Sequence, residues 1–229
     1  MKANISIFLN CILVSLIIMT GCDSSKNDSE SSTKNDDGKT KAKESSEIIW
    51  MEQNLDVETF RNGDLIPEIK SDDAWKQAQQ DEKAGWCYYD NDPANGEKYG
   101  KLYNWFAVND PRGLAPEGWR IPTKEEFKKY IDALGKNSGD KMKATSGWAE
   151  HPNGKETNGN NESGFNGLPG GYRNPKISEF NSIGNSGDWW TSTESASNAW
   201  HYSLSFQNHK MSRSTNLKSH GFSVRCIKE

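Results

Sequence analysis

The pattern of apolar and polar residues divides the chain into three parts. Residues 5–19 form an apolar run after Lys2, residues 23–46 are polar apart from Ala42, and the remainder mixes both kinds. As a helix, the apolar run would be about 22 Å long at 1.5 Å per residue, which is short of the roughly 30 Å hydrocarbon core of a bilayer. The pattern therefore favours a secretory signal peptide over a membrane-spanning helix.

The end of the apolar run, Leu16-Ile-Ile-Met-Thr-Gly-Cys22, resembles the lipobox of bacterial lipoproteins, with Met19 where that motif usually has leucine. The resemblance implies that residues 1–21 are removed and that Cys22 becomes the lipid-bearing first residue. The alternative is an ordinary signal peptide cut near Gly21, with Cys22 unmodified. Two acyl chains are enough for stable anchoring, so we expect a protein of the bacterial cell envelope, held by lipid on the outer membrane and facing the periplasm or the surface.

Residues 22–46 contain six acidic residues and five lysines, so their charges nearly cancel. Such a segment buries too little apolar surface to fold, and we expect a disordered tether. Residues 47–229 have the size of one domain. The whole chain has a net charge of −4, and the domain has no basic stripe, which excludes nucleic acid as a partner.

The clearest predicted helix follows Thr123, which forms a capping box with Glu126. Apolar side chains then recur at helical spacing from Phe127 to Leu134, and Gly135 ends the pattern. Two shorter helices are predicted over residues 72–83, capped by Ser71 or Asp72, and over residues 99–108.

The C-terminal third changes period. From Trp200 to Phe206 apolar and polar residues alternate, which predicts a strand with one buried face. Residues 222–227 are predicted to form a final strand and residues 48–51 an opening one, whereas residues 150–171 are rich in Gly, Asn and Ser and should be a loop. Strands, then helices, then strands indicate an α+β fold. All nine tryptophans lie in this domain, which predicts a core built of aromatic rings.

Several short motifs occur in order along residues 48–229. They are Trp50-Met-Glu-Gln-Asn-Leu, Tyr99-Gly-Lys-Leu-Tyr-Asn-Trp, Gly118-Trp-Arg-Ile-Pro-Thr-Lys-Glu-Glu-Phe, Gly167-Leu-Pro-Gly-Gly-Tyr-Arg, Trp189-Trp-Thr-Ser-Thr-Glu and Gly221-Phe-Ser-Val-Arg-Cys. This set resembles the Fibrobacter succinogenes major paralogous domain, which is found on many bacterial lipoproteins. That family in turn resembles the C-type-lectin-like fold of formylglycine-generating enzymes. The resemblance implies paired N- and C-terminal strands beside two helices, with long loops on one side, and supplies no established activity.

Enzyme signatures are missing from the domain. Formylglycine chemistry needs two reactive cysteines close together, but only Cys87 and Cys226 remain, far apart in sequence. There is no zinc-binding His-Glu-x-x-His pair, no Gly-x-Ser-x-Gly elbow and no phosphate-binding glycine loop. The four histidines fall in predicted loops or on a polar strand face, where we expect exposed side chains. We therefore predict a domain without catalytic activity that requires no cofactor.

The two remaining cysteines have another interpretation. Export to an oxidising compartment favours a disulfide between Cys87 and Cys226, with two buried free thiols as the alternative. Residues 90–97 offer several oxygen ligands, notably Asp90, Asp92 and Asn95, which would suit Ca²⁺. Asx-rich turns produce the same composition without a metal.

Aromatic side chains are the other candidate ligand contacts. Neighbours on a strand point to opposite faces, so Trp189 and Trp190 cannot both fill one core. One of them could stack on a sugar ring; the alternative is a second cluster of packed side chains. Trp86, Tyr88 and Tyr89 suggest a similar role.

The sequence thus predicts a lipid-anchored module that recognises a glycan or a surface protein through residues 86–97 and 150–190. One alternative is an envelope enzyme, which a deep polar pocket containing a titratable group of shifted pKa would favour. The other is a structural component of a surface assembly, which a large exposed apolar patch would favour.

Overall fold

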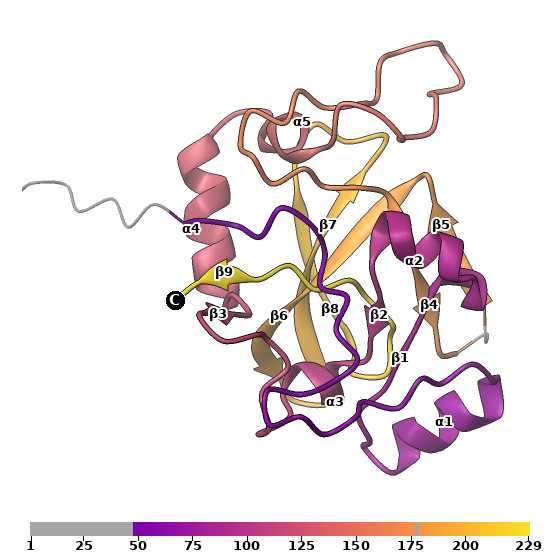
Figure 1. Ribbon diagram of the computed structural model, residues 1–229. Helices are drawn as coiled ribbons and strands as arrows, with labels where there is room; N and C mark the ends of the chain where they lie inside the picture. The colour runs from indigo at the N-terminus through magenta and orange to yellow at the C-terminus, as the bar shows by residue number, and fades with distance from the viewer. Residues whose placement is uncertain (1–47, 177–178) are drawn as a thin grey trace, which may run out of the picture. The chain divides into compact units, whose positions relative to one another are not determined.

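The protein is built on a five-stranded sheet of order β5-β4-β6-β7-β8 (Figure 1). The computed structural model describes residues 48–229 except 177–178, so Cys22 and the predicted tether lie outside the described residues. Within the sheet, β4 and β6 are parallel and all other neighbours are antiparallel. The strands are β4 (Gly170–Asn174), β5 (Glu179–Ile183), β6 (Ser186–Ser195), β7 (Asn198–Ser205) and β8 (Ser212–Leu217). With the helices described below, this confirms the predicted α+β class.

Two smaller sheets join distant parts of the chain. One pairs β1 (Trp86–Cys87) with β2 (Leu102–Tyr103), and the other pairs β3 (Trp119–Arg120) with β9 (Ile227–Lys228). Trp50 bridges Ile227, so the two ends of the described domain lie side by side (Figure 1). The predicted terminal strands are only partly correct, because residues 48–51 make a single bridge and only residues 227–228 of the last segment form a strand.

The predicted capped helix is α4 (Lys124–Leu134), and its capping box is confirmed. The Glu126 amide donates to Thr123 Oγ1 at 3.2 Å, and the Thr123 amide donates to the Glu126 carboxylate at 2.9 Å. Arg120 donates two hydrogen bonds to the same carboxylate, which lowers the pKa of Glu126 to about 2. Phe127 is fully buried, so the apolar stripe of α4 faces the core.

The remaining helices are short. Helix α1 (Asp72–Gln80) is capped by Ser71, one of the two predicted caps, and ends before the predicted Lys83. Two further short elements are α5 (Ser138–Met142) and the 3-10 turn η1 (Tyr89–Asn91). Among the described residues, no helix is long and apolar enough to cross a membrane.

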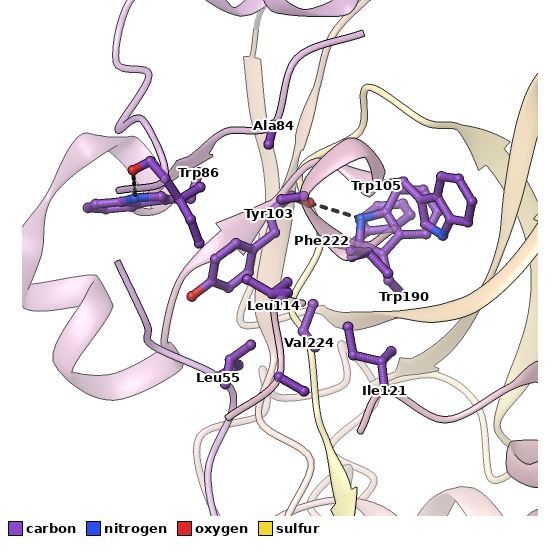
Figure 2. Close-up of a cluster of buried hydrophobic side chains, with 14 of the residues drawn as sticks. Leu55, Ala84, Trp86, Tyr103, Trp105, Leu114, Ile121, Trp190, Phe222 and Val224 are labelled. Atoms are coloured by element: carbon purple, nitrogen blue, oxygen red, sulfur yellow. Dashed lines mark hydrogen bonds between the residues drawn. The ribbon is translucent and has the colours of Figure 1, made fainter. Parts of the chain in front are cut away.

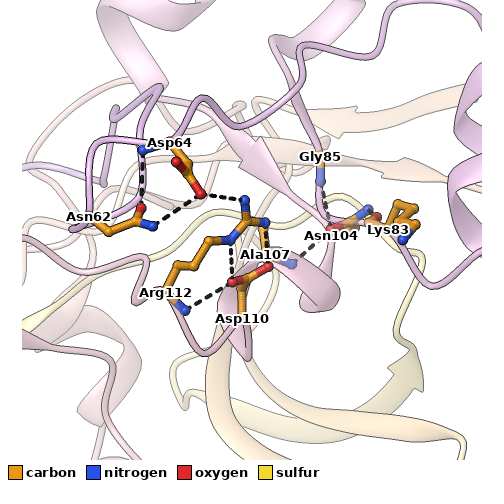
Figure 3. A network of polar contacts seen from close by, with 8 residues as sticks. All are labelled: Asn62, Asp64, Lys83, Gly85, Asn104, Ala107, Asp110 and Arg112. Carbon is orange, nitrogen blue, oxygen red and sulfur yellow. Dashed lines mark hydrogen bonds and ion pairs between the residues drawn. The ribbon is translucent and has the colours of Figure 1, made fainter.

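The predicted helix over residues 99–108 is wrong. The segment contains the end of α2 (Pro93–Tyr99), strand β2 and the separate helix α3 (Trp105–Val108). Gly100 ends α2 with a φ of 74°. Asn104 caps the start of α3. Its side-chain oxygen accepts from the amides of Ala107 and Gly85, both at 3.1 Å, and its side-chain nitrogen donates to the Lys83 carbonyl (Figure 3). These hydrogen bonds fix Asn104 as a helix cap, so a new helix starts after it although the spacing of apolar residues alone predicts one continuous helix.

Trp189 and Trp190 point to opposite faces of β6, and both are fully buried. Each belongs to a different core. The Trp190 core includes Tyr103, Trp105, Phe222 and Val224 (Figure 2). The Trp189 core includes Trp50, Phe127, Trp148, Phe165, Tyr202 and Leu204. Aromatic rings therefore fill both layers, as the tryptophan content predicts.

Arg225 holds the two ends of the domain together. It is 1% exposed, and among the described residues no carboxylate lies within ion-pair distance of it. Its guanidinium donates to Asn54 Oδ1 at 3.0 and 2.9 Å and to the carbonyls of Met51, Glu52 and Phe165 at 3.1, 3.2 and 2.6 Å. Burial lowers the pKa of Arg225 to about 9. Five hydrogen bonds thus compensate for the desolvated charge.

We expect Arg225→Ala to lower the free energy of unfolding by at least 3 kcal/mol, roughly, because several buried carbonyls would lose their donor. Urea unfolding followed by tryptophan fluorescence measures the change. Arg112→Ala is the matched control: Arg112 pairs with Asp110 and Asp64 near the surface (Figure 3) and should cost no more than about 1 kcal/mol. Equal losses in the two variants would contradict the role of Arg225.

Candidate ligand-binding pocket

The aromatic residues around β1 pack mainly within the protein, and burial contradicts the predicted ligand contacts of Trp86 and Tyr89. Trp86 and Tyr89 are buried, and Tyr88 is half-buried. The ammonium group of Lys101 makes cation–π contacts with Trp86 and Tyr88, with its Nζ 4.4 and 4.9 Å from the two ring centroids. The Lys101 side chain is 2% exposed and its Nζ lies 2.6 Å from Asp56 Oδ1. An internal cation therefore takes the place proposed for a ligand.

Trp189 and Trp190 are also unavailable to a ligand. The Trp189 indole nitrogen donates to Asn54 Oδ1 at 2.8 Å, and that of Trp190 donates to the Tyr103 carbonyl at 2.9 Å (Figure 2). Neither side chain is exposed. The prediction that one of them stacks on a sugar is wrong, and the alternative of a second packed cluster is correct.

The proposed calcium ligands serve the local backbone. Asp92 Oδ1 accepts from the Ala94 amide at 3.0 Å and caps α2, and Asn95 Nδ2 donates to the Tyr89 carbonyl at 3.0 Å. Asp90 has a φ of 54°, a conformation typical of Asx turns. In residues 48–229, leaving out 177–178, no group of three or more His, Cys, Asp or Glu side chains could hold a metal ion. The geometry fits the turn interpretation.

The predicted disulfide is absent. Cys87 and Cys226 are both free and fully buried. Cys226 lies in the Trp190 core, whereas Cys87 packs with Trp75 and Tyr89 in a third cluster. Burial raises the pKa of each thiol to about 12. The alternative of two buried thiols describes the structure.

A polar pocket lies on the Trp190 face of the sheet. Side chains alternate along β6, so Ser186 and Asp188 share the face of Trp190. Helix α3 covers the Trp190 end, where Trp105 donates to the Thr191 carbonyl at 2.9 Å, and a cavity of about 470 Å³ opens at the Ser186 end. This sheet-face pocket is lined by Tyr172, Asn174, Lys176, Ser182, Ser186, Asp188, Ser203, Asn216, His220 and Phe222. Its size falls within the roughly 300–1,000 Å³ of small-molecule sites.

Asp188 lies at the base of the sheet-face pocket and is 5% exposed. Its carboxylate accepts from Ser186 Oγ at 2.8 Å and from Ser203 Oγ on the neighbouring strand. The Nδ1 atom of His201 lies 3.5 Å from Asp188 Oδ1. The carboxylate thus organises side chains from β6 and β7.

Two histidines beside the pocket are buried, contrary to the prediction of exposed side chains. His201 is 4% and His220 6% exposed. His201 Nε2 lies 3.1 Å from Asn216 Nδ2, and His201 Nδ1 has no hydrogen-bond partner. Burial lowers the pKa of His220 to about 4. The rings of Tyr172 and Phe222 lie 6.3 and 5.3 Å from that of His220.

The arrangement does not form a nucleophilic relay. A serine relay requires the hydroxyl to donate to the imidazole and the imidazole to the carboxylate. Here Ser203 donates directly to Asp188, and the far nitrogen of His201 contacts Asn216. The pocket is chemically suited to hydrogen bonding with a polar ligand.

The alternation over residues 200–206 predicts a polar face in solvent, whereas that face of β7 lies at the pocket. The polar positions of that strand are His201, Ser203 and Ser205, and none of them is Lys, Arg, Asp or Glu. Such a face is compatible with a polar pocket as well as with solvent.

We expect acid to destabilise the protein through His220. The unfolded chain binds a proton on this histidine below about pH 6.5, and the folded protein binds it only near pH 4. The free energy of unfolding is therefore unaffected by this histidine above pH 6.5. It decreases as the pH falls from 6.5 towards 4, by up to about 3 kcal/mol. Urea unfolding between pH 7 and pH 4 should show a steeper loss for the wild type than for His220→Asn. Parallel pH profiles for the two proteins would contradict this.

Comparison with curated proteins and with solved structures finds no match. The family model described as the Fibrobacter succinogenes major domain matches residues 45–228, which include nearly all the described residues. The ordered motifs are distributed over this same range. The chain therefore belongs to the Fibrobacter succinogenes major domain family.

Proposed function

We propose that the protein is a lipid-anchored recognition module of the cell envelope that binds a glycan in the sheet-face pocket, without catalytic activity. The observation that carries the proposal is the polar lining around a buried carboxylate. Hydroxyl and amide side chains from all five strands of the sheet meet there. This chemistry suits a ligand with many hydroxyl groups.

Individual lining residues have complementary roles for a sugar. Asn174 and Asn216 offer amides that both donate and accept, as sugar hydroxyls do. Tyr172 is half-buried and lines the pocket, so its ring can pack against the apolar face of a pyranose. Six of the lining residues fall within the predicted range 150–190, mostly on strands instead of loops, and none falls within 86–97.

Anchoring by Cys22 and a C-type-lectin-like fold are part of the proposal. The lipobox-like sequence and the polar residues 22–46 support a tether between membrane and domain. The side-by-side ends of the domain are consistent with the fold implied by the resemblance. We place the protein on the outer membrane, facing the periplasm or the cell surface.

An envelope enzyme is the second candidate. The presence of Asp188 and His220, with its pKa of about 4, in one polar pocket favours it. The hydrogen bonds of Ser203 and His201 favour binding instead, because they leave no serine activated by an imidazole. Hydrolysis of a bound glycan by the purified protein would show that it is an enzyme and not only a binding module.

We expect Tyr172→Ala and Asn216→Ala to weaken glycan binding at least about fivefold, since each removes a packing surface or a hydrogen bond. A glycan array of the full-length protein identifies ligands, and titration calorimetry measures the variants. Ser212→Ala is the control, because Ser212 is exposed on β8 and outside the pocket lining. An array without any bound glycan would contradict the proposed function.

The anchor makes a separate prediction. Metabolic labelling with a clickable palmitate analogue should label the wild type and not Cys22→Ala, because the thiol is the lipid acceptor. The variant should also leave the membrane fraction. An unlabelled wild-type protein in the soluble fraction would contradict anchoring.

A further inference from the structure

The inner oxygens of the sheet-face pocket act as hydrogen-bond acceptors. Ser186 and Ser203 each donate their single hydroxyl proton in a hydrogen bond to Asp188. Each serine oxygen therefore presents only lone pairs to anything in the pocket. The base of the pocket favours a ligand group that donates several hydrogen bonds.

The carboxylate of Asp188 also lacks a cationic partner. Among the described residues, no lysine or arginine forms an ion pair with it, and its one contact of this kind is with His201. His201 contacts Asn216 through Nε2, and its Nδ1 makes no hydrogen bond to the carboxylate. His220 is unprotonated at neutral pH because burial lowers its pKa to about 4. The two serine hydroxyls that donate to the carboxylate are neutral, so a cationic ligand group would add the opposite charge that this buried acid lacks.

The walls of the pocket are compatible with a cation. The half-buried Tyr172 lines it, and the buried Phe222 packs edge-to-face against this ring with centroids 5.8 Å apart. The negative face of an aromatic ring attracts an ammonium group. Lys176, the one basic residue of the lining, is exposed, so solvent and salt screen its opposing charge.

We propose that the ligand is an amino sugar whose protonated primary amine binds to Asp188, Ser186 and Ser203. An ammonium group has three donors and no acceptor, which matches the acceptor-only base. The sugar hydroxyls then contact Asn174 and Asn216 nearer the rim. This inference rests on the proposed glycan-binding function and names the class of glycan.

Titration calorimetry of the full-length protein with glucosamine, glucose and N-acetylglucosamine tests the inference. Glucosamine should bind at least about tenfold more tightly than the two uncharged sugars, because a charge-assisted hydrogen bond is roughly twice as strong as a neutral one. Asp188→Asn should reduce this ratio to near one. Asp132→Asn, at an exposed position of α4, is the matched control and should retain it.

A second variant keeps the test independent of the stability of Asp188→Asn. Lys176→Met removes the rim charge and should raise the preference for glucosamine over glucose about two- to threefold at low salt. Equal affinity for glucosamine and glucose in the wild type would overturn the inference and leave glycan binding intact. Binding of n-butylamine as tightly as glucosamine would overturn the sugar component, and no binding of any sugar would overturn both proposals.

Discussion

Side-chain alternation on β6 is the constraint on which the rest of the structure depends. Trp189 and Trp190 must point to opposite faces of the sheet, and both are completely buried. The sheet can bury both rings only if other elements cover it on two sides. Helix α4 and Phe165 supply one cover, and α3 with Phe222 supplies the other.

Asn54 connects this constraint to the ends of the domain. Its Oδ1 accepts from Trp189 on β6 and from Arg225 near the C-terminus. Its Nδ2 donates to the Tyr99 carbonyl at 2.8 Å. One asparagine thus joins the N-terminal segment, α2, the central sheet and the C-terminal segment, which explains why a buried guanidinium without a carboxylate partner is tolerated.

The pocket is a consequence of incomplete cover on one face. Beyond Trp190, the same face of β6 carries Asp188 and Ser186 instead of apolar side chains. Under an apolar helix face, the oxygen lone pairs that these residues do not use on one another would lack a donor. They satisfy one another and leave oxygen lone pairs facing an open cavity. A rigid sheet thereby holds a polar site directly beside an aromatic core.

What the sequence determined by itself was the local structure and the family. The capping box and apolar stripe of α4, the Ser71 cap of α1 and the alternation of β7 all depend on residues a few positions apart, and the ordered motifs identified the family. Tertiary structure decided which candidate residues are accessible. The Lys101 ammonium lies over the rings of Trp86 and Tyr88, Asn54 and Tyr103 accept from the two indoles of β6, and Asp188 accepts from Ser203 on the neighbouring strand. These contacts join residues that local periodicity does not relate, because burial and hydrogen-bond partners are set by packing between elements.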